Sequence, residues 1–164
     1  MSDTTPAFDS ASFRTVLGHF LSGVTVVTAM GAEHPVGMAV GSFSSLSLDP
    51  PLVLFCPGKT ASAWGAIEAS GAFCVNMLAA DQEPLSRVFS SKVEDRFAGL
   101  AWSRSPYTGS PIIGGGLAWI DCTIDSIHEG GDHFIVVGAV RGLGVGSEAG
   151  PLAYYRGGYG RFEQ

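Results

Sequence analysis

The chain has 164 residues, of which 46% are apolar and 15% charged, and its net charge is −6. This length predicts one domain with its own core, and the apolar content excludes a disordered chain. No run of Lys or Arg occurs, so the positive surface on which nucleic-acid binding depends is missing and we expect no nucleic-acid partner.

The amino-terminal stretch "MSDTTPAFDS" has neither a basic region nor an apolar one, and no apolar run reaches 18 residues. We therefore expect no secretory signal, no membrane span and a cytoplasmic location. Residues 1–9 are expected to form a flexible tail. Asp9 or Ser10 can then cap a helix that ends at Gly23, with a row of apolar residues at Phe13, Val16, Leu17, Phe20 and Leu21.

The central part of the chain alternates between short apolar strands and two helices. Helices are expected over 59–71, which Gly71 ends, and over 80–91, which Asp81 caps. The segment 102–116 contains several Gly, Pro and Ser residues and is predicted to be irregular. Strands are expected over 24–30, 34–44, 50–56 and 72–78.

The segment 117–128, "LAWIDCTIDSIH", alternates between apolar and polar residues. This pattern predicts a strand with Ile120 and Cys122 on one face and Asp121 and Thr123 on the other. A Gly-Gly turn and the strand "DHFIVVGAVRGLGV" follow, and the chain closes with "PLAYYRGGYGRF". Strands dominate and hairpins recur, so residues 1–164 are predicted to form one mainly β domain, a closed antiparallel barrel with Greek-key character and peripheral helices.

Several well-known chemical motifs are missing from the sequence. No GxGxxG or phosphate-binding Walker loop occurs, and no GxSxG nucleophile motif is found. The four histidines show no metal-ligand spacing with Cys56, Cys74 and Cys122, so no metal site is expected. The cysteines are odd in number and lie in apolar stretches, which predicts buried free thiols in a reducing compartment.

Three short polar stretches could together bind a phosphorylated or heteroaromatic ligand. Each one alone is more typical of a capped helix end or a solvated turn than of a binding site, and only their coincidence favours a ligand. They are "GMAVGSFSSLSLDPP" with Ser42 and Ser47, "CPGKTASAW" with Lys59, Thr60 and Ser62, and "VFSSKVEDRF" with Ser90, Ser91, Lys92 and Arg96.

The order and spacing of four stretches carry a family resemblance from Phe13 onward. They are "FRTVLGHFLSGVTVVTA", "PVGMAVGSFSSLSLDPPLVLFC", "GAFCVNMLAADQEPLSRVFSS" with the following "DRFAG", and "GGDHFIVVGAV" with the closing "PLAYYRGGYGRF". The chain resembles the short-chain flavin reductases, which supply reduced flavin to two-component monooxygenases. The resemblance implies an FMN-binding split barrel, a homodimer, and a flavin near the subunit interface.

The resemblance also implies roles for individual residues. His133 in "GGDH" would lie by the nicotinamide as the catalytic residue, and Tyr159 would help to form that side of the pocket. Ala39, Val40, Gly41 and Ser42 would contact the flavin ring edge, mostly through the main chain, because this chain lacks the Thr and Asn side chains common in relatives. The remaining flavin contacts would come from Ser47, Cys56, Pro57, Lys59, Thr60, Ser62, Phe89, Ser90, Ser91 and Arg96.

The expected function is that of an NAD(P)H:flavin oxidoreductase which passes reduced flavin to a flavin-dependent oxygenase. The sequence leaves open FMN or FAD as the flavin, and NADH or NADPH as the nucleotide. An alternative is a flavin-storage protein without rapid turnover, to which the Ala39-Val40-Gly41 departure could point. A third reading is an interaction protein that keeps only the fold, which would leave the three polar stretches without a role.

Overall fold

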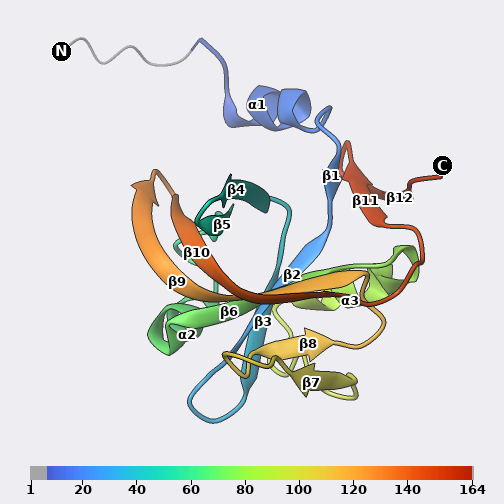
Figure 1. Cartoon of the computed structure of the whole chain (residues 1–164). Helices are drawn as coiled ribbons and strands as arrows, with labels where there is room; N and C mark the ends of the chain where they lie inside the picture. Colours follow the sequence, from blue (N-terminus) through green and yellow to red (C-terminus); the bar gives the residue numbers. More distant parts are fainter. Residues whose placement is uncertain (1–6, 164) are drawn as a thin grey trace.

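The computed structural model describes residues 7–163, which fold mainly into antiparallel strands with three α-helices (Figure 1). The mainly β fold class expected from the sequence is confirmed. Residues 1–6 of the expected tail lie outside the described range. Asp9, at the end of that segment, caps the first helix, because its carboxylate accepts a 2.8 Å hydrogen bond from the Ser12 amide.

One seven-stranded antiparallel sheet forms the body of the molecule, in the hydrogen-bonded order β3-β2-β6-β9-β10-β5-β4. The long β9–β10 hairpin curves strongly (Figure 1), and its two register shifts, at 137/138 and 140/142, account for the bend. The strands are β2 (Thr25–Met30), β3 (Pro35–Val40), β4 (Ser44–Leu48), β5 (Pro51–Phe55), β6 (Ala72–Met77), β9 (Ala118–Gly130) and β10 (His133–Val145).

The sheet does not close into a continuous barrel within residues 7–163, because its two edges, β3 and β4, are not hydrogen-bonded to each other. The chain crosses from one edge to the other through residues 41–43. There the Ser42 hydroxyl accepts from the Cys56 amide at 2.9 Å and donates to the Cys56 carbonyl at 3.2 Å. These bonds continue the β4–β5 pairing and do not join β3 to β4, so the closed barrel expected from the strand pattern is corrected to the split barrel that the resemblance implies.

The main core lies between the sheet and α2 (Trp64–Ser70). Phe55 and Phe73 meet edge to face with ring centroids 4.9 Å apart, and Trp64 packs against Phe55 from the helix. Gly138 on β10 leaves room for this cluster, since a Cβ there would lie 2.4 Å from the Phe73 ring. The helix ends at Gly71 with a left-handed φ of 67°, as the sequence predicts.

The helix α3 (Glu83–Phe89) follows β6 through a 3-10 turn, η1 (Ala80–Gln82). Asp81 does not cap this helix, contrary to the prediction. Gln82 satisfies the local main chain instead, because its side-chain oxygen accepts from the Ala79 amide at 3.0 Å. Phe89 at the helix end is buried beside Phe97, with ring centroids 5.1 Å apart, and this second core cluster fixes α3 across β2 and β3.

The segment predicted to be irregular contains a short hairpin, β7 (Trp102–Arg104) and β8 (Pro111–Ile113). Its turn covers Asp121 on β9, which is fully buried. Asp121 accepts hydrogen bonds from the amides of Tyr107 and Thr108, both at 3.0 Å, and from the Thr108 hydroxyl. The polar face that the alternation predicts is therefore covered at Asp121, where three internal donors take the place of water.

A small three-stranded sheet closes the chain and consists of β1 (Ser22–Gly23), β11 (Leu152–Tyr155) and β12 (Gly158–Arg161). The first helix, α1 (Ser10–Leu17), stands off from the sheets, with no buried residue (Figure 1). The helix is confirmed, but it ends at Leu17 and not at Gly23. Its apolar side is exposed, since Val16 is 69% accessible and Phe20, just after the helix, is 80% accessible. None of the helices in residues 7–163 is long and apolar enough to cross a membrane.

Candidate functional site

β3 is an edge strand, so half of its main-chain polar groups have no strand partner. The Thr25 hydroxyl of β2 donates to the Val40 carbonyl at 2.7 Å, which places the polar groups of Val40 on the β2 side. Because hydrogen-bond direction alternates along an antiparallel strand, the N–H and C=O of Ala39 point to the free edge. The Gly37 carbonyl, in the same alternation, accepts there from Arg96 at 2.8 Å.

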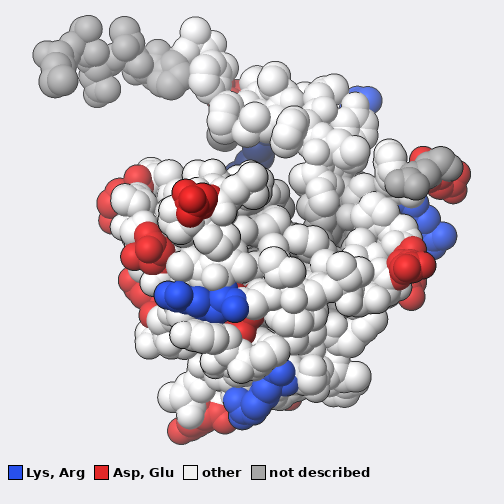
Figure 2. All heavy atoms as spheres, viewed as in Figure 1, with Lys and Arg blue, Asp and Glu red and all other residues white. Residues whose placement is uncertain are grey.

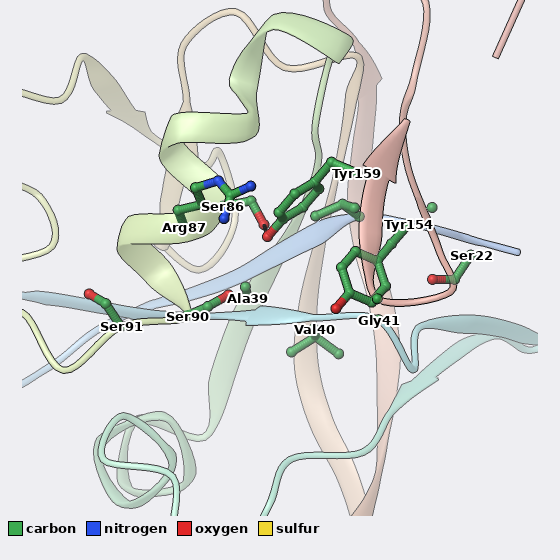
Figure 3. Close-up of a pocket in the computed structure, with 13 residues that line it drawn as sticks. Ser22, Ala39, Val40, Gly41, Ser86, Arg87, Ser90, Ser91, Tyr154 and Tyr159 are labelled. Carbon is green, nitrogen blue, oxygen red and sulfur yellow. Dashed lines mark hydrogen bonds between the residues drawn. The ribbon is translucent and has the colours of Figure 1, made fainter. Parts of the chain in front are cut away.

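Three adjoining cavities follow this free edge and form one depression, which we call the β3 groove. The first, of about 470 Å³, lies between Ala39 and Tyr159 (Figure 3). The second, of about 270 Å³, lies between Ala39 and Arg96. The third, of about 690 Å³, extends from Arg96 to Lys92. Neighbouring cavities share lining residues, Ala39 between the first two and Arg96 between the last two, so a ligand longer than any single cavity can lie along the groove.

The wall opposite β3 in the first cavity is aromatic. Tyr154 extends from the β11–β12 hairpin toward Val40 on β3, and Tyr159 extends from it toward Ser86 on α3 (Figure 3), with ring centroids 5.2 Å apart. The Tyr159 hydroxyl lies 2.8 Å from the Ser86 hydroxyl, and the Arg87 guanidinium lies 4.9 Å from the Tyr159 ring. Arg87 is also paired with Glu83 at 2.6 Å. A flat ring could therefore lie between a main-chain edge and an aromatic wall.

The other end of the groove is polar and carries more positive than negative charge. Lys92 and Arg96 line the third cavity with His34, against one carboxylate, Glu94. Thr60 and Ser62 add hydroxyl groups there. Ammonium, guanidinium and hydroxyl donors are the groups that bind phosphate oxygens in proteins, so this end suits a phosphorylated ligand.

His133 lies at the tip of the β9–β10 hairpin and does not line any of the three cavities. Its Nδ1 lies 2.7 Å from a carboxylate oxygen of Asp132, and this hydrogen bond holds the pKa of Asp132 below its usual range. Gly58 pairs with His133 through an isolated bridge, the Lys59 amide donates to the Asp132 carbonyl at 3.0 Å, and the Lys59 ammonium pairs with Glu129. The tip is thus attached to the segment that leads into the third cavity.

The cysteines take no part in the groove. Cys74 and Cys122 are buried and free, as expected, whereas Cys56 is half-buried. Burial, helped by the nearby Asp121 carboxylate, raises the pKa of Cys122 to about 12 and raises that of Cys74 further, so both remain protonated thiols. Among residues 7–163, no three His, Cys, Asp or Glu side chains gather closely enough to hold a metal ion.

Residues 17–163 match the family model of the flavin reductase like domain. This chain belongs to that family. The match spans the β3 groove, the aromatic hairpin and the β9–β10 tip, so the whole candidate site lies within the flavin reductase domain.

Curated relatives share this family over most of their length. One is the reductase subunit HsaB of a flavin-dependent monooxygenase from Mycobacterium tuberculosis, 54% identical over 92% of this chain and 81% of the relative. Another, from Agrobacterium fabrum, is the FMN reductase (NADH) SmoA, 42% identical over 95% of this chain and 88% of the relative.

Solved structures of flavin reductases agree with the fold. A homologue of nitrilotriacetate monooxygenase component B from Mycobacterium thermoresistibile superposes with a TM-score of 0.91 at 53% identity, covering 94% of this chain and 87% of that one. The NADH:FAD oxidoreductase SgcE6 from Streptomyces globisporus gives a TM-score of 0.90 at 36% identity, covering 100% of this chain and 99% of that one.

The structure divides the residues predicted for the flavin reductase site into two groups. The first group lines the β3 groove: Ala39, Val40, Gly41, Thr60, Ser62, Phe89, Ser90, Ser91, Arg96 and Tyr159. Phe89 stands apart within it, because its ring is only 2% exposed and packs in the core. The second group lines none of the three cavities: Ser42, Ser47, Cys56, Pro57, Lys59 and His133.

Sequence reasoning missed several residues of the groove, although signals for two of them were present. Tyr154 and Tyr159 face each other across the "RGG" turn, so recognising a tight hairpin there would have paired the two rings. Ser86 lies one helical turn before Ser90, which was predicted, so both lie on the same helix face. Others that line the first cavity are Ser22, Gly23, Val24, Arg87 and Gly157.

Proposed function

We propose that this protein is an NAD(P)H:flavin oxidoreductase that reduces FMN or FAD and supplies the reduced flavin to a partner monooxygenase. One observation carries the proposal: the free main-chain edge at Ala39 faces two tyrosines and continues into a cavity rich in cations and hydroxyls. This arrangement offers hydrogen bonds to a heteroaromatic ring at one end and to a phosphate at the other. The relatives named flavin reductase or reductase subunit support the same activity.

The groove residues fit a flavin. The Ala39 amide and carbonyl would hydrogen-bond the polar edge of the isoalloxazine, and Tyr154 and Tyr159 would bound the same cavity on its opposite side. The ribityl chain would follow the second cavity, and the Lys92 ammonium would face the phosphate. The Thr and Asn side chains that relatives carry beside this strand are dispensable here, because the edge of β3 supplies a donor and an acceptor from the main chain.

Bound flavin supplies the redox chemistry, since its N5 accepts a hydride from C4 of the reduced nicotinamide. The protein's part is to bind and orient both partners. His133 lies outside the groove and pairs with Gly58, in the segment that leads into the third cavity, so we assign it to the nucleotide. Asp132 engages Nδ1 of His133, which leaves Nε2 free to donate to or accept from the nicotinamide nucleotide. No general base is needed for the hydride transfer, so His133 orients and does not have to move a proton.

We propose a homodimer in the cytoplasm, with a flavin-dependent oxygenase as the recipient of reduced flavin. The support for self-association is the apolar surface of α1 and the residues after it, where Phe13, Val16 and Leu17 are more than half exposed. Figure 2 shows few charges on this part of the surface. Burying such a surface against a second copy removes it from water. Light scattering on the purified protein gives the subunit number, and a monomer would contradict the proposal.

The activity is tested by following NADH and NADPH absorbance with and without added FMN, FAD or riboflavin. Oxidation that depends on added flavin is the expected result, and the rates also settle both cofactor preferences. A folded protein that binds flavin yet oxidises neither nucleotide would overturn the proposal and favour flavin storage. A folded protein that does not bind flavin would leave only an interaction role.

A further inference from the structure

Arg96 connects three elements that line the β3 groove. Its Nη1 donates to the Gly37 carbonyl on β3 at 2.8 Å. Its Nη2 donates to the Ser91 carbonyl just after α3 at 2.6 Å, and to the Ser62 hydroxyl in the turn before α2 at 3.1 Å. All of these elements contribute residues to the second or third cavity. A single guanidinium therefore joins three segments that are far apart in the sequence.

We infer that Arg96 is a positioning residue, which holds the walls of the groove at the separation that a flavin needs and does not itself bind the flavin phosphate. The inference rests on the proposed function, in which this groove takes the flavin. Both terminal nitrogens of Arg96 are already engaged by protein acceptors. Its Nε is buried and meets no acceptor within residues 7–163. Three of the five N–H groups are therefore used and the Nε–H is enclosed, so one Nη1 N–H remains and the paired donors with which an arginine grips a phosphate are not available.

Lys92 provides the contrast within the same cavity. It lines the third cavity with Arg96, and its ammonium forms no ion pair among the described residues. An unengaged ammonium on a flexible side chain can reach a phosphate, whereas a guanidinium fixed by three acceptors cannot turn toward one. The charge of Lys92 and the geometry of Arg96 are therefore two separable contributions to flavin binding.

The shape of the guanidinium is what the three contacts require. Its planar fork reaches the Gly37 carbonyl with one terminal nitrogen and the Ser62 and Ser91 oxygens with the other. A lysine at this position keeps the positive charge but concentrates its donors on one nitrogen, so it cannot span acceptors on both sides. Arg96→Lys therefore removes the contacts that position the groove walls and keeps the positive charge.

The decisive experiment compares FMN with riboflavin, which lacks the phosphate, in the NADH oxidation assay. Arg96→Lys is expected to raise KM for FMN and for riboflavin by the same factor, about tenfold, the size of effect expected when hydrogen bonds to a charged group are lost. The kcat at saturating flavin should stay within about twofold of wild type, since the reacting groups are untouched. Lys92→Gln is the matched charge variant, and it should raise KM for FMN and leave KM for riboflavin unchanged.

Three results would overturn the inference. Arg96→Lys could bind both flavins as wild type does, it could weaken FMN alone, or its melting temperature could fall while both KM values stay unchanged. The second result would identify Arg96 as a phosphate ligand, and the third would leave it a purely structural residue.

Ser62→Ala supplies a second variant should Arg96→Lys fail to fold. It removes one of the three acceptors without changing any charge. Both KM values should rise together by about threefold, in line with one modest hydrogen bond. An unchanged pair of KM values, or a rise for FMN alone, would overturn the inference. A wild-type protein without flavin-dependent NADH oxidation would instead contradict the proposed function, so the two failures are distinguishable.

Discussion

The β3 groove and the tip of the β9–β10 hairpin contain the two halves of the predicted site, and they are built from different kinds of polar contact. In the groove, Arg96 reaches three segments through neutral acceptors, and Phe89 supports β3 from the core. At the tip, His133 and Asp132 form an exposed hydrogen-bonded pair, with side chains 49% and 94% accessible. An isolated β-bridge between His133 and Gly58 connects the tip to the segment before α2.

This difference predicts separate roles, with flavin binding in the groove and nucleotide binding at the hairpin tip. The two carbonyl contacts of Arg96 are partly buried, and breaking one leaves a polar group with reduced access to water, so these contacts favour a fixed shape. Exposed polar pairs contribute little to stability, since water competes for both partners. We therefore expect the groove to set the affinity for flavin and to contribute to stability. Substitutions at the tip should change the KM for the nucleotide and leave the free energy of unfolding almost unchanged.

The largest expected effect comes from Phe89→Ala. The ring is 2% exposed and lies behind β3, where it packs against Phe97 and against Gly37. Its removal should lower the free energy of unfolding by about 3–5 kcal/mol, as for other buried aromatic side chains. Chemical denaturation measures this loss. A flavin-contact role without a core role would instead leave the denaturation midpoint unchanged and raise only the KM for flavin.

Ala39→Pro tests the main-chain edge directly. Proline removes the outward N–H, and an edge strand tolerates proline where that N–H faces away from the sheet. KM for FMN should rise about tenfold, the loss expected for one hydrogen bond left unmade in a largely buried site. Ala39→Gly keeps the N–H and is the matched control. Equal KM values for the two variants, measured by flavin-dependent NADH oxidation, would show that flavin does not use this amide.

His133→Ala should change the nucleotide step alone. We expect KM for NADH to rise several-fold and kcat to change by no more than about twofold, because the side chain orients the nucleotide and transfers no proton. KM for FMN should not change, since His133 lines none of the groove cavities. Steady-state kinetics at varied NADH and fixed FMN, and the reverse, separate these constants. Wild-type rates at every NADH concentration would remove His133 from the site.

Asp132→Asn is expected to have the smallest effect, a pH-dependent change in melting temperature. The hydrogen bond from His133 lowers the pKa of Asp132 below its ordinary value of 3.8, so the carboxylate is favoured in the folded state. The stability that the Asp132 carboxylate contributes is present above pH 3.8 and is lost as the pH falls from there through the lowered pKa. The wild-type protein should therefore melt slightly above the variant at neutral pH, and the two should converge in acid. A constant difference across the whole range would contradict this linkage.

Much of the fold could be predicted from patterns within single segments. The apolar runs at 24–30 and 72–78 and the Gly71 stop were predicted because burial on both faces and a left-handed cap leave local signals. The burial of Asp121 could not be predicted, because its donors come from Tyr107 and Thr108, which no local pattern connects to it. Asp81 failed as a cap because the chain enters α3 through a 3-10 turn that Gln82 stabilises.

The candidate site was predictable in its residue types but not in its arrangement. The polar stretches around Ser62, Ser90 and Arg96 do meet in the groove, as their coincidence indicated. The aromatic wall was only half predicted, since Tyr154 becomes a lining residue through the pairing of β11 with β12. Arg96 was predicted as a ligand contact, and its three protein acceptors could not be foreseen, because they depend on how α2, α3 and β3 pack together.

The free edges of the split sheet have a consequence for solubility. An unpaired strand edge is a template on which another chain can add a strand and begin to aggregate. On β3, the Arg96 side chain occupies the Gly37 carbonyl, so the stretch of open edge that remains around Ala39 is too short to pair a strand. On β4, the register shift between Ser45 and Ser47 interrupts the ladder and twists that edge out of line. The sheet can therefore stay open for a ligand without inviting a neighbouring chain to extend it.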